Sequence, residues 1–327
     1  MKIIDSFLFF QELDLLEIRL RYLNDYVDFF VIVEACQTFT GKKKEFVFEK
    51  NKERFTAYSH KIKYYKIQDF HDSYESIMKH LSLSYDPSYQ KISNILEKHD
   101  HYPKSKIHWV LDTYHREYLH FALDKEADDD DIVLLSDLDE IPSIATFDEN
   151  IIDKFNRELI VFQQAEFKYF LNFYNDSEWL GTIASRYSLM KDYSFNCLRI
   201  DSKKNRNIIS KDTLKNGGFH FTSCGNVDMI KNKIQSWAHQ EFNNNLVMKN
   251  LEKNIMSGND IFLRKTNHQL EKLDISKSQI FDDSIRQIMK DFPHLVFSGK
   301  IQSVDNSLLS KMYNKFAIII YKIKQKL

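Results

Sequence analysis

The fold is decided by the stretch Ile132-Val133-Leu134-Leu135-Ser136-Asp137-Leu138-Asp139-Glu140-Ile141-Pro142. Its first residues are apolar without alternation, which is typical of a parallel strand covered on both faces. Two carboxylates, Asp137 and Asp139, follow directly at the carboxyl end of that strand. In open α/β sheets the ligand site lies at the carboxyl ends of the strands. The stretch therefore predicts a buried strand that carries acidic side chains into a site.

The segments around this strand alternate between helical and extended patterns. Helical periodicity is found at 11–24, 71–127, 147–157, 226–250 and 278–292. Strands are expected at 27–33, 61–67, 132–136 and 159–164. This alternation predicts an α/β fold with a mainly parallel sheet. We expect one catalytic domain over residues 1–265, followed by a helical C-terminal extension over residues 266–327.

Composition and charge restrict the class of protein. The 327 residues include 46 Lys and Arg against 47 Asp and Glu, which gives a formal net charge of −1. Without a basic excess, a protein whose main task is to grip nucleic-acid phosphates is not expected. The 3 cysteines form no C-x-x-C pair, and acidic residues interrupt the N-terminal apolar segment too early for a secretory signal. These features favour a cytoplasmic protein with reduced thiols.

The C-terminal segment combines an apolar run with basic residues. Residues 316–321 lie among the lysines Lys311, Lys315, Lys322, Lys324 and Lys326. No window reaches the roughly 18 apolar residues of a transmembrane helix. Segment 308–327 is therefore either an ordinary amphipathic terminal helix or a basic interfacial helix that contacts anionic lipid at the inner face of a membrane.

Asp137 and Asp139 are candidates for binding a divalent cation. Where the strand turns into a loop, both carboxylates can converge on one ion, and hard oxygen ligands suit Mg²⁺ or Mn²⁺. Such an ion usually shares its coordination with substrate phosphate. His220 follows two glycines, which allow the backbone to approach a ligand closely, and its imidazole suits Mn²⁺ as a third ligand. The alternatives are an acidic loop without metal and a hydrogen-bonded core histidine.

Further candidates lie in the second half of the chain. Glu241 is a general base if it faces the site, and a solvated helix carboxylate otherwise. The aromatic residues within 167–179, which include Tyr169 and Trp179, are either core residues or a platform for the C–H faces of sugars.

Several segments resemble glycosyltransferase family 17, which contains the β-1,4-mannosyl-glycoprotein 4-β-N-acetylglucosaminyltransferases. FLFFQELDLLEIRL at 7–20, residues 27–34 and TFTG at 38–41 are similar to its N-terminal block. SDLDEIP at 136–142 looks like its acidic metal motif. WLGT at 179–182, GFHF at 218–221 and AHQEF at 238–242 are similar to its later blocks, in the same order.

The resemblance implies a GT-A-like, Rossmann-type nucleotide-sugar fold, inversion at the anomeric carbon, and Mn²⁺ or Mg²⁺ on the donor diphosphate. The donor expected is UDP-N-acetylglucosamine, and the acceptor is a hydroxyl of an oligosaccharide or glycolipid. Two departures are Lys44-Glu45, where the family often has Lys-Pro, and the absence of the N-terminal anchor of Golgi members. The second favours a microbial-type, cytoplasmic member.

The resemblance also suggests roles for individual residues. The metal ligands would be Asp137, Asp139 and His220, and Glu241, or else Glu140, would be the base. The donor would contact Glu34 and Thr38 through its nucleoside, and Asp137 and Lys44 or Arg186 through its phosphates. Trp179 and Tyr169 would contact the acceptor.

Two other classes of protein stay open. An apolar strand that ends in Asp-x-Asp also occurs in haloacid-dehalogenase-like phosphatases, in which Asp137 would be the nucleophile. A non-catalytic sugar-binding module could use the same aromatic residues.

Overall fold

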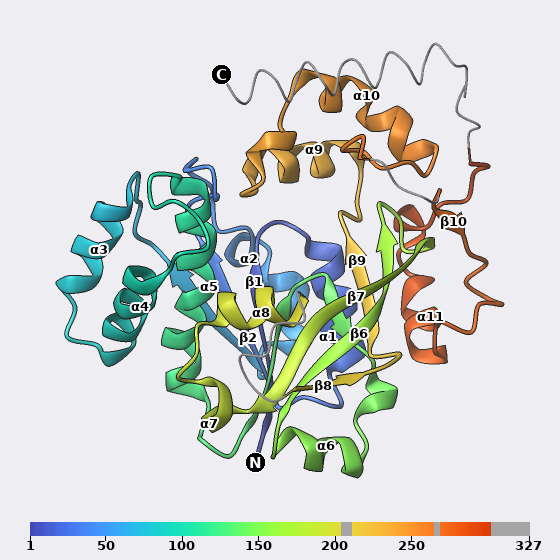
Figure 1. The fold of residues 1–327 in the computed structure, drawn as a ribbon. Coiled ribbons are helices and arrows are strands. Elements are labelled where there is room, and N and C mark those ends of the chain that lie inside the picture. The colour runs from blue at the N-terminus through green and yellow to red at the C-terminus, as the bar shows by residue number, and fades with distance from the viewer. Residues whose placement is uncertain (204–210, 265–268, 302–327) are drawn as a thin grey trace.

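The computed structural model describes residues 1–203, 211–264 and 269–301 (Figure 1). Its strands are β1 (Ile3–Phe9), β2 (Phe29–Ala35), β3 (Ile62–Ile67), β4 (Ile132–Asp137), β5 (Glu140–Pro142), β6 (Leu159–Lys168), β7 (Phe173–Arg186), β8 (Lys211–Leu214), β9 (Gly218–Thr222) and β10 (Glu271–Lys272). Its α-helices are α1 (Leu13–Leu23), α2 (Val47–Lys50), α3 (Tyr74–Ser82), α4 (Pro87–Lys98), α5 (Ile107–Glu126), α6 (Glu149–Phe155), α7 (Tyr187–Met190), α8 (Phe195–Lys203), α9 (Val227–Ser236), α10 (Asn245–Met256) and α11 (Asp283–Met289). Short 3-10 helices are η1 (Lys52–Tyr58), η2 (Ile144–Thr146), η3 (Gln240–Phe242) and η4 (Pro293–Leu295).

The N-terminal half of the sheet is parallel, with the strand order β3-β2-β1-β4. β1 lies between β2 and β4, and its Phe7 is in register with Ile32 on one side and with Ser136 on the other. α1 connects β1 to β2, and α3, α4 and α5 lie between β3 and β4 in the chain. The predicted strands β2, β3 and β4 are confirmed, whereas the central strand β1 is absent from the prediction.

The second half of the sheet departs from the predicted mainly parallel arrangement. β7 is antiparallel to both β4 and β6, and β5 is antiparallel to β9. The cause is local: β6 ends at Lys168, β7 begins at Phe173, and Tyr169 takes the left-handed conformation (φ 69°) within that short turn. Parallel neighbours would need a crossover of about a dozen residues or more. The described sheet is therefore mixed, and the prediction of a mainly parallel sheet is wrong.

Helices cover both faces of the sheet (Figure 1). Ile32 of β2 packs into an apolar cluster with α1, α6 and α11. Its neighbours Val31 and Val33 point to the opposite face and pack with α3, α4, α5 and α8. A third cluster joins α9 and α10 to Tyr169 and Phe173 at the turn between β6 and β7. Since both faces are covered, the strands carry continuous apolar runs.

The helix predicted over 226–250 is interrupted in the structure. α9 ends at Ser236, η3 follows, and α10 starts a new helix. The Asn244 side chain accepts hydrogen bonds from the backbone N–H groups of Leu246 and Val247, which is a helix-start signal. The helix predicted over 278–292 is the shorter α11.

The part of the C-terminal region that the structure describes, 269–301, packs against the sheet. β10 pairs with β7, and α11 contributes apolar side chains to the same cluster as α1. The predicted terminal helix 308–327 lies outside the described residues. The domain division at residue 265 stays a prediction.

A fully buried arginine joins α1 to the strand ends. Arg19 donates from Nε and Nη2 to the carboxylate of Asp5 on β1 at 2.7 and 2.6 Å, and both side chains are 0% exposed. Its Nη1 donates to the backbone carbonyls of Asp137, Leu138 and Glu140 at 3.0, 3.0 and 2.8 Å. Arg19 therefore fixes the turn that follows β4.

Replacing Arg19 by methionine tests this role. Arg19→Met leaves Asp5 as an unpaired buried charge, so we expect the free energy of unfolding to fall by about 3–5 kcal/mol in urea denaturation. Arg21 is a matched control because it lies on the same helix, pairs with Asp291 and is 26% exposed. Arg21→Met should cost no more than about 1 kcal/mol. Equal losses in the two variants would contradict the role assigned to Arg19.

Candidate functional site

A cavity of about 430 Å³ lies at the carboxyl ends of the parallel strands. Its walls come from the ends of β1, β2 and β4, from β6 and β9, from α5 and α8, and from the segment between α9 and α10. Both Asp137 and Asp139 line it. The cavity is thus where the sequence pattern predicts the ligand site.

Asp137 is held by two arginines. Arg116 of α5 donates from Nη1 to Asp137 Oδ1, and Arg199 of α8 donates from Nε and Nη2 to Oδ2 at 3.0 and 2.6 Å. Burial acts to raise the pKa of Asp137, but the two guanidinium groups outweigh burial and hold the pKa well below its usual range. Asp137 is therefore ionised.

Asp139 lies between a lysine and a histidine. Lys233 of α9 donates to Asp139 Oδ2 at 3.0 Å, and Asp139 Oδ1 is 3.8 Å from His220 Nε2. Burial acts to raise the pKa of Asp139, but Lys233 and His220 bring it below its ordinary value. Burial lowers the pKa of His220, which leaves its ring neutral at neutral pH. Asp139 and His220 are therefore a carboxylate and a neutral imidazole that face each other.

Strand pairing brings His220 to this position. Glu140 of β5 is in register with His220 of β9, and the Phe221 N–H donates to the Asp139 carbonyl at 2.8 Å. Gly218 makes the pairing possible, because it has φ +125° and a Cβ there would meet the Ile141 carbonyl oxygen at 2.2 Å. Gly218, one of the two glycines that made His220 a candidate in the sequence, is therefore required for the pairing of β9 with β5.

A divalent ion fits part of the predicted ligand set. Within the described residues, Asp137, Asp139 and His220 do not form a group whose ligand atoms all lie within 4.8 Å of one another. The Asp139–His220 pair does fit, since two ligands each about 2.1 Å from one ion lie at most about 4.2 Å apart and these atoms are 3.8 Å apart. Asp137 differs, because both of its oxygens accept hydrogen bonds from arginines.

The structure does not bring Glu140 into the cavity. Its side chain is 1% exposed, and Oε1 accepts hydrogen bonds from Trp179 Nε1 and Lys203 Nζ at 2.8 and 2.9 Å. Oε2 accepts a hydrogen bond from the Asp137 N–H at 3.0 Å. These contacts indicate that Glu140 orients Trp179 and Lys203. They fit the predicted role of Glu140 as a base less well.

Only some of the residues predicted to contact the donor line the cavity. Thr38 and Lys44 line the cavity, but Glu34 is fully buried behind it and accepts hydrogen bonds from Lys44 Nζ at 2.6 Å and from the backbone of Val47 and Phe48. Glu34 thus positions Lys44 and the start of α2.

Arg186 lies at the opposite end of β4 from Asp137. It is in register with Ile132, so five residues of strand, about 17 Å, separate it from the cavity. Its guanidinium pairs with Asp130 and contacts Asn156. This position does not fit the predicted phosphate contact.

Tyr169 and Trp179 both line the cavity, whereas Glu241 does not. The Tyr169 hydroxyl donates to the Asn259 carbonyl at 3.0 Å, and the Trp179 ring stacks on His220 with centroids 4.1 Å apart. Glu241 accepts a hydrogen bond from His239 Nδ1 at 2.7 Å, and His239 itself lines the cavity. Glu241 therefore lies behind the cavity wall, in contact with the lining residue His239.

The basic residues around the two aspartates are absent from the sequence prediction. Arg116, Arg199 and Lys233 line the cavity, and Lys203 lies beside them. Burial and the neighbouring Arg199 lower the pKa of Lys203, although Glu140 opposes this. A local sequence signal exists for Arg116 alone, since it follows Asp112 by four residues on the same helix and pairs with it at 3.2 Å.

An aromatic group lines another part of the cavity and is also absent from the prediction. Its members are Tyr102, Trp109, Trp237, His239, Phe242 and Phe262. The rings of Tyr102 and Trp109 are stacked, with centroids 4.1 Å apart and planes 6° from parallel, and His239 meets Trp109 edge-on at 4.6 Å. The interruption between α9 and α10 supplies three of these residues, which explains why a continuous helix over 226–250 hides them.

A buried carboxylate positions α8 and its cations. Glu117 of α5 is 0% exposed and accepts hydrogen bonds from Ser194 Oγ at 2.6 Å and from the N–H groups of Phe195 and Asn196 at 3.1 and 3.0 Å. These groups lie at the N-terminus of α8, where a carboxylate satisfies donors that lack helical partners. Arg199 is one turn further along.

Comparison with known proteins identifies the class of this molecule. A protein-family model described as Glycosyltransferase family 17 matches residues 1–81 and 76–267. The match covers more than half of the chain, so the chain is a glycosyltransferase. It belongs to glycosyltransferase family 17, which confirms the resemblance seen in its motifs and sets aside the phosphatase and the non-catalytic module. No curated protein and no solved structure matches the chain.

Within the described part of the chain, no helix is long and apolar enough to span a membrane. The basic segment 308–327, predicted as either an ordinary amphipathic helix or an interfacial helix, lies outside that part.

Glu117→Gln tests how α8 is held. The variant keeps the shape of the side chain but replaces one acceptor oxygen by an amide, so a buried N–H loses its partner at a cost of about 1–3 kcal/mol. We expect faster amide hydrogen exchange in peptides covering 195–203. Exchange in α9 peptides serves as the internal control. Unchanged exchange in α8 would contradict the capping role.

Proposed function

We propose that the chain transfers N-acetylglucosamine from UDP-N-acetylglucosamine, with inversion and with help from a divalent cation, to a hydroxyl of an oligosaccharide or glycolipid. The observation that carries this proposal is the cavity in which Asp137 and Asp139 lie among Arg116, Arg199 and Lys233. The GT-A-like assignment and a cytoplasmic location belong to the same proposal.

The cations suit a nucleoside diphosphate as leaving group. Negative charge develops on the diphosphate as the sugar departs, and preorganised positive groups stabilise that transition state. Arg116 and Arg199 offer planar guanidinium groups, which bind phosphate oxygens in pairs. Their side chains are 12% and 27% exposed, so part of each group is accessible from the cavity.

Asp139 and His220 are the residues that would hold Mn²⁺ or Mg²⁺, with Asp137 beside them. Such an ion would neutralise charge on the donor diphosphate. Lys233 now occupies Asp139 Oδ2, and Oδ1 is turned toward His220. A carboxylate and a neutral imidazole are a suitable pair for Mn²⁺.

The nucleoside would lie against the ends of β2 and β3. Val33, Thr38 and Ile67 line the cavity there, next to the paired rings of Phe39 and His115, whose centroids are 5.3 Å apart. Burial lowers the pKa of His115 to about 3, so this ring is neutral and adds no charge to the wall. An apolar wall with a few hydrogen-bonding groups is typical of a base-binding pocket.

The acceptor would bind at the aromatic group that includes Tyr102 and Trp109. The C–H faces of sugar rings pack on aromatic rings, and this group lies in the same cavity as the two aspartates. Trp179, stacked on His220, would then lie nearer the transferred sugar than the acceptor.

Glu166 is the carboxylate best placed to accept the proton of the acceptor hydroxyl. It lines the cavity, and its Oε2 accepts hydrogen bonds from Ser177 Oγ at 2.6 Å and from Asn175. This leaves Oε1, which is 3.9 Å from His220 Nδ1. Glu241, which contacts His239, is the second candidate.

A screen of nucleotide sugars tests the donor and the cation together. With the wild-type chain and Mn²⁺, we expect UDP-N-acetylglucosamine to raise the melting temperature and to be turned over. Asp139→Asn should lower turnover by about 100-fold or more, because an electrostatic partner of the leaving group is lost. Asp153→Asn is the control, since Asp153 is an exposed residue that pairs with Arg157.

Three results would contradict the proposal in different ways. Full activity of the Asp139 variant in EDTA would reject the metal role. Turnover of a simple phosphate ester with Mg²⁺, but of no nucleotide sugar, would favour phosphatase chemistry. Carbohydrate binding that is indifferent to metal and nucleotide would favour a binding module.

The base is tested by comparing Glu166→Gln with Glu241→Gln. General-base catalysis contributes about 10²–10⁴-fold to the rate, so Glu166→Gln should lower kcat by about that factor while KM for the donor changes little. Glu241→Gln should change kcat only a few-fold. The reverse pattern would make Glu241 the base, as the sequence suggests.

A further inference from the structure

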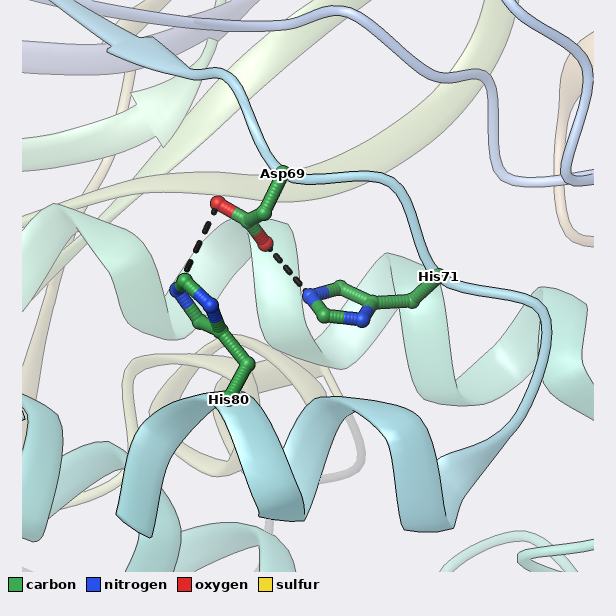
Figure 2. A group of neighbouring side chains, drawn as sticks. All are labelled: Asp69, His71 and His80. Carbon is green, nitrogen blue, oxygen red and sulfur yellow. Dashed lines mark hydrogen bonds and ion pairs between the residues drawn. The ribbon is translucent and has the colours of Figure 1, made fainter. Parts of the chain in front are cut away.

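Three side chains of metal-ligand type meet outside the cavity just described. Asp69 and His71 lie in the loop that follows β3, and His80 lies on α3 (Figure 2). Asp69 Oδ2 is 2.6 Å from His71 Nε2, and Asp69 Oδ1 is 3.8 Å from His80 Nε2. One ligand atom from each of the three lies within 4.8 Å of the other two. Figure 2 shows both imidazoles directed at the carboxylate.

Surrounding groups hold these side chains in place. Ser76 Oγ is 2.7 Å from His71 Nδ1, and the Tyr114 hydroxyl donates to Asp69 Oδ2 at 2.7 Å. Histidines that bind metal commonly use their second ring nitrogen in this way, and the carboxylates that bind metal are commonly hydrogen-bonded too. Burial acts to raise the pKa of Asp69, but the bonds from His71 and Tyr114 outweigh it and hold the pKa below its ordinary value.

The backbone of the loop is also fixed. The Gln37 side chain accepts a hydrogen bond from the His71 N–H at 3.0 Å and donates one to the His71 carbonyl. His71 is therefore held at its main chain and at Nδ1, while its Nε2 faces Asp69. An ion bound by Nε2 and Asp69 would replace the proton between these two atoms, and the fixed backbone keeps the loss of conformational freedom small.

A hydrogen bond joins Asp69 to His71, whereas His80 lies beside them through edge-on ring contacts with His71 and Tyr89. At 3.8 Å, His80 Nε2 is too far from Asp69 for a hydrogen bond, and no hydrogen bond to the His80 ring is found within the described part of the chain. The distance does suit two ligands of one ion. His80 is 38% exposed, so an ion and a water molecule can reach the group from solvent.

We propose that Asp69, His71 and His80 form a site for a divalent transition-metal ion, with Zn²⁺ as the fitting probe and water as a fourth ligand. Two imidazoles and one carboxylate are a ligand set that zinc takes in proteins. The ion would join the loop after β3 to α3, and through Tyr114 to α5. Because Gln37 and Ile67 line the cavity and border this loop, the ion would stabilise one cavity wall.

Zinc binding by the full-length chain, with no affinity tag, tests the proposal. After removal of metal, equilibrium dialysis should give about one tightly bound zinc ion per chain, and zinc should raise the melting temperature. His80→Ala should weaken binding by about 100-fold or more, since loss of a supporting residue alone costs about 10–100-fold. His60→Ala, at an exposed histidine outside the group, should leave binding unchanged.

Two comparisons separate this site from the one at Asp139. Asp139→Asn should keep the zinc-induced rise in melting temperature, whereas His80→Ala should lose that rise and keep its response to Mn²⁺ and donor. Circular dichroism confirms that the variants are folded, and Asp69→Asn provides a second test of the ligand set. No zinc bound to the wild-type chain, or equal affinity in His80→Ala, would overturn the proposal, whatever the donor proves to be.

Discussion

The site depends on one buried charge pair, Arg19 with Asp5. Removing two charges from water is costly, and the cost is offset only when every donor and acceptor is satisfied. Arg19 meets this condition: besides Asp5 and Ser136 Oγ, it binds three backbone carbonyls of the segment 137–140. The turn after β4 is therefore specified by a side chain from α1. Three of its backbone carbonyls face the guanidinium, while the side chains of both aspartates line the cavity.

Once the turn is fixed, the other elements converge on it. β9 binds the Asp139 carbonyl and aligns His220, α8 is held by Glu117 and presents Arg199, and α9 presents Lys233. Each contact joins residues that are far apart in the chain. The site is thus a property of the tertiary structure, although its two aspartates are adjacent to a strand that the sequence already reveals.

What could be predicted from the sequence follows from local patterns. The apolar runs of β2 and β4 are local patterns, and the structure confirms both strands. The two aspartates at the end of β4 line the cavity, and their role as metal ligands stays a prediction. Arg19 lies among the charged residues between the leucines of α1, so periodicity places it at the surface, yet it is 0% exposed. The antiparallel half could not be predicted either, because a short turn with Tyr169 in the left-handed conformation, rather than a crossover, joins β6 to β7. Arg199 and Lys203 could not be predicted because they lie 62 and 63 residues along the chain from Asp137 and Glu140, their partners, and only the tertiary structure brings them together.

At the cavity, the acidic and basic side chains around the turn after β4 pair with one another. Asp137 is paired with Arg116 and Arg199, and Asp139 with Lys233, so the charges around the turn are largely balanced within the protein. On the proposed function, a donor diphosphate would compete with Asp137 for the two guanidinium groups. A cation at Asp139 would likewise compete with Lys233. The carboxylates would then keep the basic groups in position before the donor arrives, which lowers the reorganisation needed for binding. Donor and metal would each release a group that binds the other, so we expect their binding to be cooperative.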